Sequence, residues 1–213
     1  MPSPLGHALG AIAAGWLVGG RQRPAAAGSA HPAAARAAFE APGITTMTAL
    51  FAMAGVAPDL DLLVPGAHST YTHSIGAVAL VFAATVATAR RLLRAHQASP
   101  LRRSSRFAAA MAAAWASHLL LDWLGSDSRA PIGIMALWPF TAAHYQSNFY
   151  VFDAISRRYW MPEQFVWGNL KAVAREVAIL APIAWIAYRL TQGAGRRDTT
   201  VARHPTPGSP REG

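Results

Sequence analysis

Histidine and aspartate residues in this sequence occur at positions where charged side chains are uncommon. His118 and Asp122 lie four residues apart inside an apolar stretch, so on a helix both side chains project from the same face. Asp59 and Asp61 come at the end of another apolar stretch, after a proline, and His73 directly precedes a third. Imidazole nitrogens and carboxylate oxygens are common ligands of Zn²⁺. The chain has no cysteine, so any metal must be held by nitrogen and oxygen.

A carboxylate inside an apolar run is costly unless it is paired, and such residues usually serve a function. We therefore interpret five residues as candidate metal ligands: His7, Asp59, His73, His118 and Asp122. Asp59 and Asp61 are the candidate general bases, and the sequence does not separate them. A structural ion-pair network is the main alternative. The remaining histidines are interpreted as interfacial or solvated residues: His31, His68, His96, His144 and His204.

Five apolar stretches must position these side chains, at residues 5–20, 44–64, 74–89, 107–124 and 177–190. The chain is 53% hydrophobic and 14% charged, whereas about 25% of residues are charged in an ordinary soluble domain. Several stretches are shorter than the ~20 residues of a spanning helix, but five in series favour an all-α, polytopic membrane bundle. We expect one domain over residues 1–190 and a disordered basic tail over residues 191–213.

The basic residues predict an orientation in the membrane. If the five stretches alternate across the bilayer, 14 of the 19 lysine and arginine residues fall on one side. The positive-inside rule makes that side cytoplasmic. This places the N-terminus outside and the C-terminus inside the inner (cytoplasmic) membrane, with every candidate ligand at the outer face. The net charge of +9 is thus explained by topology. We expect no nucleic-acid partner, because the arginines lack the interleaved aromatic residues of a single-strand groove.

The segment over residues 123–167 holds 11 of the chain's 20 aromatic residues. Aromatic side chains are enriched where a membrane meets water. We therefore expect an aromatic-rich outer segment beside the candidate ligands, either anchoring the protein at the interface or contacting substrate. Its location favours a lipid-borne ester or phosphoester as the substrate.

Short motifs in a fixed order resemble the predicted membrane-bound metal-dependent hydrolases of bacteria, often called YdjM-like. They are Pro4-Leu5-Gly6-His7, Pro58-Asp59-Leu60-Asp61, Thr72-His73-Ser74, His118-Leu119-Leu120-Leu121-Asp122 and Leu137-Trp138-Pro139-Phe140. The resemblance implies a helical fold distantly similar to zinc-dependent phospholipase C and S1/P1-type nucleases, with the five candidate ligands holding zinc or serving in acid–base chemistry. His144 is followed four residues later by Asn148, where those enzymes place a glutamate, so we expect one or two metal ions rather than three.

These observations favour a membrane-bound, metal-dependent hydrolase. It would bind Zn²⁺ or a similar divalent cation, with the bilayer and a small-molecule or lipid substrate as partners. The alternative is a non-enzymatic membrane protein in which the histidines and aspartates form a structural metal or ion-pair site. Transport, with carboxylates as ion sites, is a third hypothesis. It is the weakest, because the polar residues gather at one face and trace no path across the membrane.

Overall fold

The computed structural model describes residues 1–20, 44–95, 101–127 and 130–201. Across these residues the fold is mostly helical, and strand pairing is limited to isolated bridges. This agrees with the all-α prediction. The described helices are α1 (Pro4–Gly19), α3 (Ile44–Val56), α4 (Ile75–Ala95), α5 (Leu101–Trp123) and α6 (Asn169–Val201). Two 3₁₀ helices, η1 (Ala57–Leu63) and η2 (Tyr71–His73), and the π-helical η3 (Glu163–Gly168) complete them.

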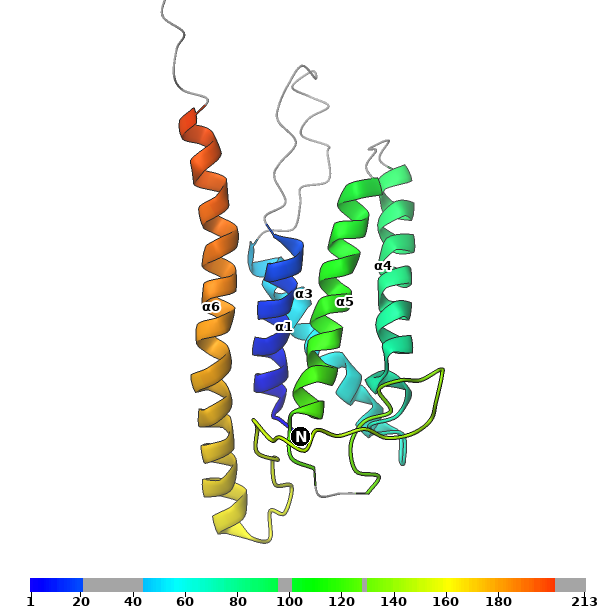
Figure 1. Ribbon diagram of the computed structural model, residues 1–213, viewed down its shortest axis with the longest axis vertical. Coiled ribbons are helices and arrows are strands. Elements are labelled where there is room, and N and C mark those ends of the chain that lie inside the picture. Colours follow the sequence, from blue (N-terminus) through cyan, green and yellow to red (C-terminus); the bar gives the residue numbers. More distant parts are fainter. Residues whose placement is uncertain (21–43, 96–100, 128–129, 202–213) are drawn as a thin grey trace, which may run out of the picture.

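The α-helices lie side by side and alternate in direction along the chain (Figure 1). Helix α1 packs against α3, α5 and α6, and α4 packs against α5. In Figure 1, α6 and α4 form the two outer edges of the bundle. As a consequence, the start of α1, η1 after α3, η2 before α4 and the end of α5 meet at one end of the molecule. This is the end at which the N-terminus lies.

Small residues bring the central helices close together. A Cβ atom on Gly15 would lie 2.3 Å from the Phe51 ring, and one on Gly55 would lie 2.2 Å from the Cβ atom of Ala11. The core around them consists largely of buried alanines, with Trp16 and Phe51 as its large members. Helices packed through glycine and alanine approach more closely than helices packed through branched side chains. The close packing of α1 against α3 fixes the position of His7, which lies on the first of these helices.

Two segments of the described chain are long and apolar enough to cross a membrane, Thr45–Leu63 and Ile75–Leu92. Helix α1 is apolar but shorter. No residue of the Ile75–Leu92 segment is buried within the protein, so this helix presents apolar side chains outwards. The sequence prediction of about five apolar spans is therefore supported for two by length and composition. Helix α5 is not one of these two segments, and the polar side chains of His118 and Asp122 contribute to its lower mean hydropathy.

The helix boundaries differ from the predicted stretches in two places. Residues 44–64 form α3 followed by η1, because Pro58 stands at the start of the 3₁₀ helix and cannot donate a helical hydrogen bond. Helix α6 continues to Val201, into the predicted disordered tail. The chain contains no proline between Pro182 and Pro205 that would interrupt it. Residues 202–213 lie outside the described residues.

The segment that joins α5 to α6 covers the end of the bundle where the N-terminus lies (Figure 1). It is held by main-chain hydrogen bonds: Met135 donates to the carbonyl of Ser69, and Ile75, at the start of α4, donates to the carbonyl of Ala136, both at 2.9 Å. Many of its aromatic side chains are exposed, among them Phe140, Phe149, Tyr159, Trp160 and Trp167.

Candidate metal centre

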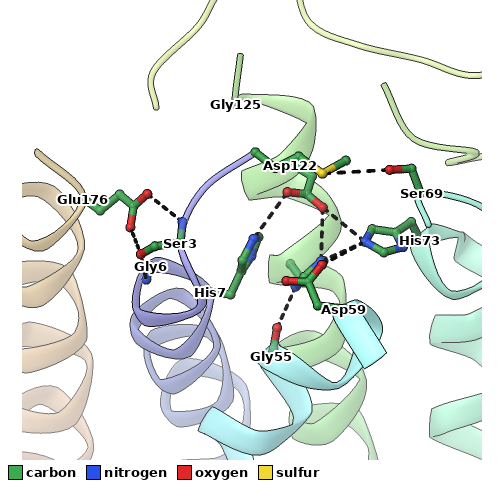
Figure 2. Close-up of polar contacts among 12 residues, drawn as sticks. Ser3, Gly6, His7, Gly55, Asp59, Ser69, His73, Asp122, Gly125 and Glu176 are labelled. Atoms are coloured by element: carbon green, nitrogen blue, oxygen red, sulfur yellow. Dashed lines mark hydrogen bonds and ion pairs between the residues drawn. The ribbon is translucent and has the colours of Figure 1, made fainter. Parts of the chain in front are cut away.

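The five candidate ligands converge at this end of the bundle, although they lie far apart in the sequence. Figure 2 shows His7, Asp59, His73 and Asp122 directed towards one another. Helix α1 contributes His7, η1 contributes Asp59, η2 contributes His73, and α5 contributes His118 and Asp122. Asp61 and His68 lie next to them. We call these seven residues the His/Asp cluster: His7, Asp59, Asp61, His68, His73, His118 and Asp122. Its members form three overlapping groups whose ligand atoms lie within 4.8 Å of one another.

Three donor atoms in the cluster lie around a common point, and a fourth lies beside two of them. The Nε2 atoms of His73 and His118 are 3.0 Å apart. Asp122 Oδ2 lies 3.3 Å from the first and 3.1 Å from the second, and Asp59 Oδ1 lies 3.7 Å and 3.6 Å from them. Tetrahedral coordination with bonds of about 2.0–2.1 Å would separate ligand atoms by about 3.3 Å. The donor atoms of His73, His118 and Asp122 therefore have the spacing of a zinc-type ligand set, and Asp59 lies somewhat farther from both imidazoles.

The main chain of α3 sets the orientation of the His118 ring. Its Nδ1 atom lies 2.7 Å from the carbonyl oxygen of Gly55. A carbonyl only accepts hydrogen bonds, so Nδ1 carries the proton and donates. In a neutral imidazole this leaves Nε2 with its lone pair directed at the centre of the cluster. Histidine ligands of metals are commonly held in this way by a carbonyl or a carboxylate.

Asp61 and Thr72 hold the His73 ring in the corresponding manner. His73 Nδ1 lies 3.1 Å from Asp61 Oδ2 and 2.9 Å from Thr72 Oγ1. The Thr72 hydroxyl itself donates to Asp61 Oδ2 at 2.6 Å, so its oxygen is free to accept from the ring. The Trp115 indole donates to the Thr72 carbonyl at 2.9 Å and ties η2 to α5. His73 therefore also directs Nε2 at the common point.

The Nε2 atoms of two imidazoles whose Nδ1 atoms both donate elsewhere cannot face each other at 3.0 Å unless a cation lies between them. In the absence of metal that cation is a proton. Burial lowers the pKa of His73, but the carboxylates of Asp122, Asp59 and Asp61 outweigh burial and raise it to about 11. The protonated His73 then donates from Nε2 to His118. A divalent ion at the common point would replace this proton.

Asp122 is the most deeply placed carboxylate of the cluster. It is 2% exposed, and its two oxygens face histidine nitrogens on opposite sides, with His7 Nε2 at 3.3 Å from Oδ1. Among the described residues, neither oxygen has a partner with hydrogen-bond geometry. His7 stacks on the His118 ring, with the ring centroids 3.7 Å apart. Buried polar atoms are normally satisfied, so the two oxygens of Asp122 mark a site that fits a cation.

The structure separates Asp59 from Asp61, which the sequence does not. Asp61 directs Oδ2 at Thr72 and His73, and its Oδ1 lies 2.9 Å from His68 Nδ1. These contacts make it a residue that positions histidines. Asp59 directs Oδ1 towards the imidazoles of His73 and His118. Its side chain is 18% exposed, so it lies between the buried donors and the surface.

Sequence reasoning missed His68, which was interpreted as an interfacial residue. Besides its contact with Asp61, its Nδ1 is 3.9 Å from Asp59 Oδ1. The signal was available, because His68 is five residues before His73 and follows η1 by only a short turn, so it could not lie far away. Ser69 after it has a φ of 64°, an uncommon value for a residue with a side chain. His31, His96 and His204 lie outside the described residues, and His144 joins none of the three groups.

Sequence reasoning also missed Glu176 on α6, which is fully buried. Its carboxyl group accepts hydrogen bonds from the main-chain nitrogen of Ser3, at 2.8 Å, and from the Ser3 hydroxyl. Ser3 in turn caps α1 by accepting from Gly6 N (Figure 2). This contact fixes the start of α1, one turn before His7. The signal was a lone glutamate at the edge of an apolar stretch.

Comparisons with known proteins give one match. No curated protein and no solved structure matches the chain significantly. The distant similarity to phospholipase C and S1/P1-type nucleases therefore stays a prediction. The model of the YdjM inner membrane protein family, in contrast, matches residues 1–195, which include all seven residues of the His/Asp cluster. The chain belongs to the YdjM inner membrane protein family.

Proposed function

We propose that this membrane protein is a metal-dependent hydrolase, with His73, His118 and Asp122 as ligands of a divalent ion and Asp59 beside the position left for water. The carrying observation is the spacing of the three donor atoms, 3.0–3.3 Å, together with the two Nδ1 atoms that already donate elsewhere. Two nitrogen donors and one oxygen donor suit a catalytic Zn²⁺ site, which keeps its fourth position for water. His7 borders this set on the Asp122 side, and a second ion would need it or His68.

The residues of the His/Asp cluster divide the work of a hydrolase. A bound divalent cation would lower the pKa of water towards neutrality and stabilise the negative charge that develops on an ester. Asp59 is the proposed general base, because its exposed edge faces the side from which water and substrate can approach. Asp61 positions His73 and His68. Asp122 and His7 are buried and hold the opposite side of the cluster.

The membrane setting favours an ester or phosphoester at the outer face of the inner membrane. We propose that all five α-helices are embedded in the bilayer, with the N-terminus outside and the C-terminus in the cytoplasm. The alternating helix directions support this, because they separate the His/Asp cluster from the ends of α1, α4 and α6, where arginines are dense. The exposed aromatic side chains beside the cluster have the composition of a membrane interface.

Chromogenic substrates test the enzymatic part of the proposal. Purified protein in mild detergent is assayed with a nitrophenyl phosphodiester and a nitrophenyl carboxylic ester, before chelation, after chelation and after Zn²⁺ is restored. We expect turnover that disappears on chelation and returns with Zn²⁺. Asp59→Asn should lower the turnover rate by about 10²–10⁴-fold, the usual contribution of a general base. Gly168→Ala is the control, since a Cβ atom added at Gly168 would contact no side chain or main chain of another element within 4 Å.

The burial of the cluster favours a second candidate function, a structural metal site without catalysis. His7, His73, His118 and Asp122 are each at most 2% exposed, as in a closed structural site. The same preparations distinguish the two candidates. A protein that contains stoichiometric metal, unfolds at a lower temperature after chelation, and hydrolyses neither substrate has a structural site, and the hydrolase proposal is then wrong.

A further inference from the structure

An apolar groove of about 430 Å³ opens on the surface between α4, α5 and the segment that follows α5. This volume is in the range of ~300–1,000 Å³ that is usual for small-ligand sites. Its walls are almost wholly apolar, and it is open along one side. The main lining residues are Ile75, Val78, Leu119, Trp123, Leu137 and Tyr145.

The setting of the groove indicates what surrounds it. Its α4 wall, Ile75 and Val78, belongs to the candidate span Ile75–Leu92, of which no residue is buried in the protein. In a protein of an inner membrane family, such a helix face lies against hydrocarbon. Trp123 and Tyr145 line the groove at the end where the chain leaves α5, and these residue types prefer the boundary between hydrocarbon and water. The groove therefore faces the bilayer near its outer boundary.

The groove lies at the level of the His/Asp cluster. Leu119 and Trp123 each follow a cluster residue, His118 and Asp122, by one position on α5. Successive side chains on a helix are separated by a rise of only 1.5 Å, so groove and cluster occupy the same turns on adjacent faces. On α4, Ile75 follows His73 by two residues. The main-chain hydrogen bond from Ile75 to Ala136 closes the groove beside η2.

We propose that this groove binds a hydrocarbon chain of a bilayer lipid and so brings the lipid's ester or phosphoester group to the His/Asp cluster. The binding of the hydrocarbon chain is argued from the groove alone, whereas the delivery of the ester rests on the proposed hydrolase function. A lipid held here has its chain beside α4 and its polar head at the depth of Asp59, the exposed edge of the cluster. The substrate class that follows is a long-chain membrane lipid rather than a water-soluble ester.

Photocrosslinking in a lipid bilayer tests the binding. The full chain is reconstituted in nanodiscs of phosphatidylglycerol that carry a diazirine in the half of one acyl chain next to the head group, irradiated, and mapped by peptide mass spectrometry. We expect crosslinks to residues 116–123 and 134–145 at least fivefold above those on the exposed face of α6 around Trp185, which is 61% exposed. Crosslinks spread evenly over the lipid-facing helices would overturn the proposal.

A substitution that fills the groove gives the second readout. Ala116 lines it, so Ala116→Phe should reduce groove crosslinking at least fivefold while the metal content stays at the wild-type level. Ala84→Phe, at an exposed position of α4, is the matched control and should change neither. Unchanged crosslinking in Ala116→Phe would contradict the proposal, and if this variant does not fold, the wild-type map decides. If wild type purified without chelators contains no metal but still crosslinks at the groove, the hydrolase proposal is wrong and the proposed lipid binding is supported.

Discussion

Gly55→Ala tests whether the packing of α3 against α1 positions the metal ligands. A Cβ atom at this position would lie 2.2 Å from Ala11 Cβ and 2.7 Å from the carbonyl oxygen of His7. Ordinary carbon contacts are about 3.5 Å or more, so the two helices must separate by about 1.3 Å. The obstacle includes the main chain of α1, so a side-chain rotation cannot relieve it.

Either way of separating the helices disturbs the cluster. If α3 moves, the 2.7 Å hydrogen bond from His118 to the Gly55 carbonyl is lost. If α1 moves, His7 is drawn away from Asp122, which now lies 3.3 Å from it. Overpacking of this kind costs about 1–3 kcal/mol of folding stability. Loss of a partner that orients a ligand weakens metal binding by about 10–100-fold.

The assay is competition for Zn²⁺ against a chromogenic chelator in mild detergent, alongside thermal unfolding of the same preparations. Gly168→Ala is the control, because it adds the same methyl group at an exposed glycine, where the new Cβ atom would contact no other element within 4 Å. We expect Gly55→Ala to bind Zn²⁺ at least tenfold more weakly than the control and to unfold at a lower temperature. If the two variants bind Zn²⁺ equally, the Gly55 carbonyl does not position His118.

Three other predictions concern proton release on metal binding, the contact of Glu176 with Ser3, and the membrane topology. Because His73 has a pKa of about 11 without metal and must be neutral to bind one, calorimetry in buffers of different ionisation enthalpy should detect about one proton released per ion. The apparent affinity should rise by about tenfold per pH unit from pH 6 to 8, and a pH-independent affinity would contradict this. Glu176→Gln should lower the unfolding temperature, since it breaks the paired contact with Ser3 at a cost of about 1–3 kcal/mol, while stoichiometric metal is retained; complete loss of metal would show a direct role in the site. In this cysteine-free chain, Phe140→Cys should react with an impermeant maleimide in spheroplasts and Arg90→Cys only after permeabilisation, and the reverse pattern would invert the proposed topology.

Much of the cluster could be predicted because its members interrupt apolar stretches. A carboxylate such as Asp122 is conspicuous in a run of alanine and leucine, and alternation of the stretches was enough to bring His7, Asp59, His73 and His118 to one end. The helices themselves followed from the same apolar runs. Their ends were harder to predict, because the 3₁₀ geometry after Pro58 and the length of α6 depend on local backbone hydrogen bonding.

The roles within the cluster could not be predicted from the sequence. Asp59 and Asp61 have the same chemistry and differ by two positions, and only the direction of each carboxylate, towards the imidazole Nε2 atoms or towards Nδ1 of His73 and His68, distinguishes them. The Gly55 carbonyl that orients His118 belongs to the main chain and leaves no mark in the residue type. The apolar groove arises from three separate segments, none of which signals a cavity by itself.

Metal content is the measurement that tests the central claim most directly. Wild type and the His118→Ala/Asp122→Ala double variant are extracted in mild detergent without chelators, and their metal is quantified per chain by plasma mass spectrometry, with Gly168→Ala as the control. The proposed metal site predicts one or two divalent ions per chain in wild type and control, and a loss of at least one ion per chain in the double variant. Wild type without stoichiometric metal, or a double variant that keeps the wild-type amount, would contradict it.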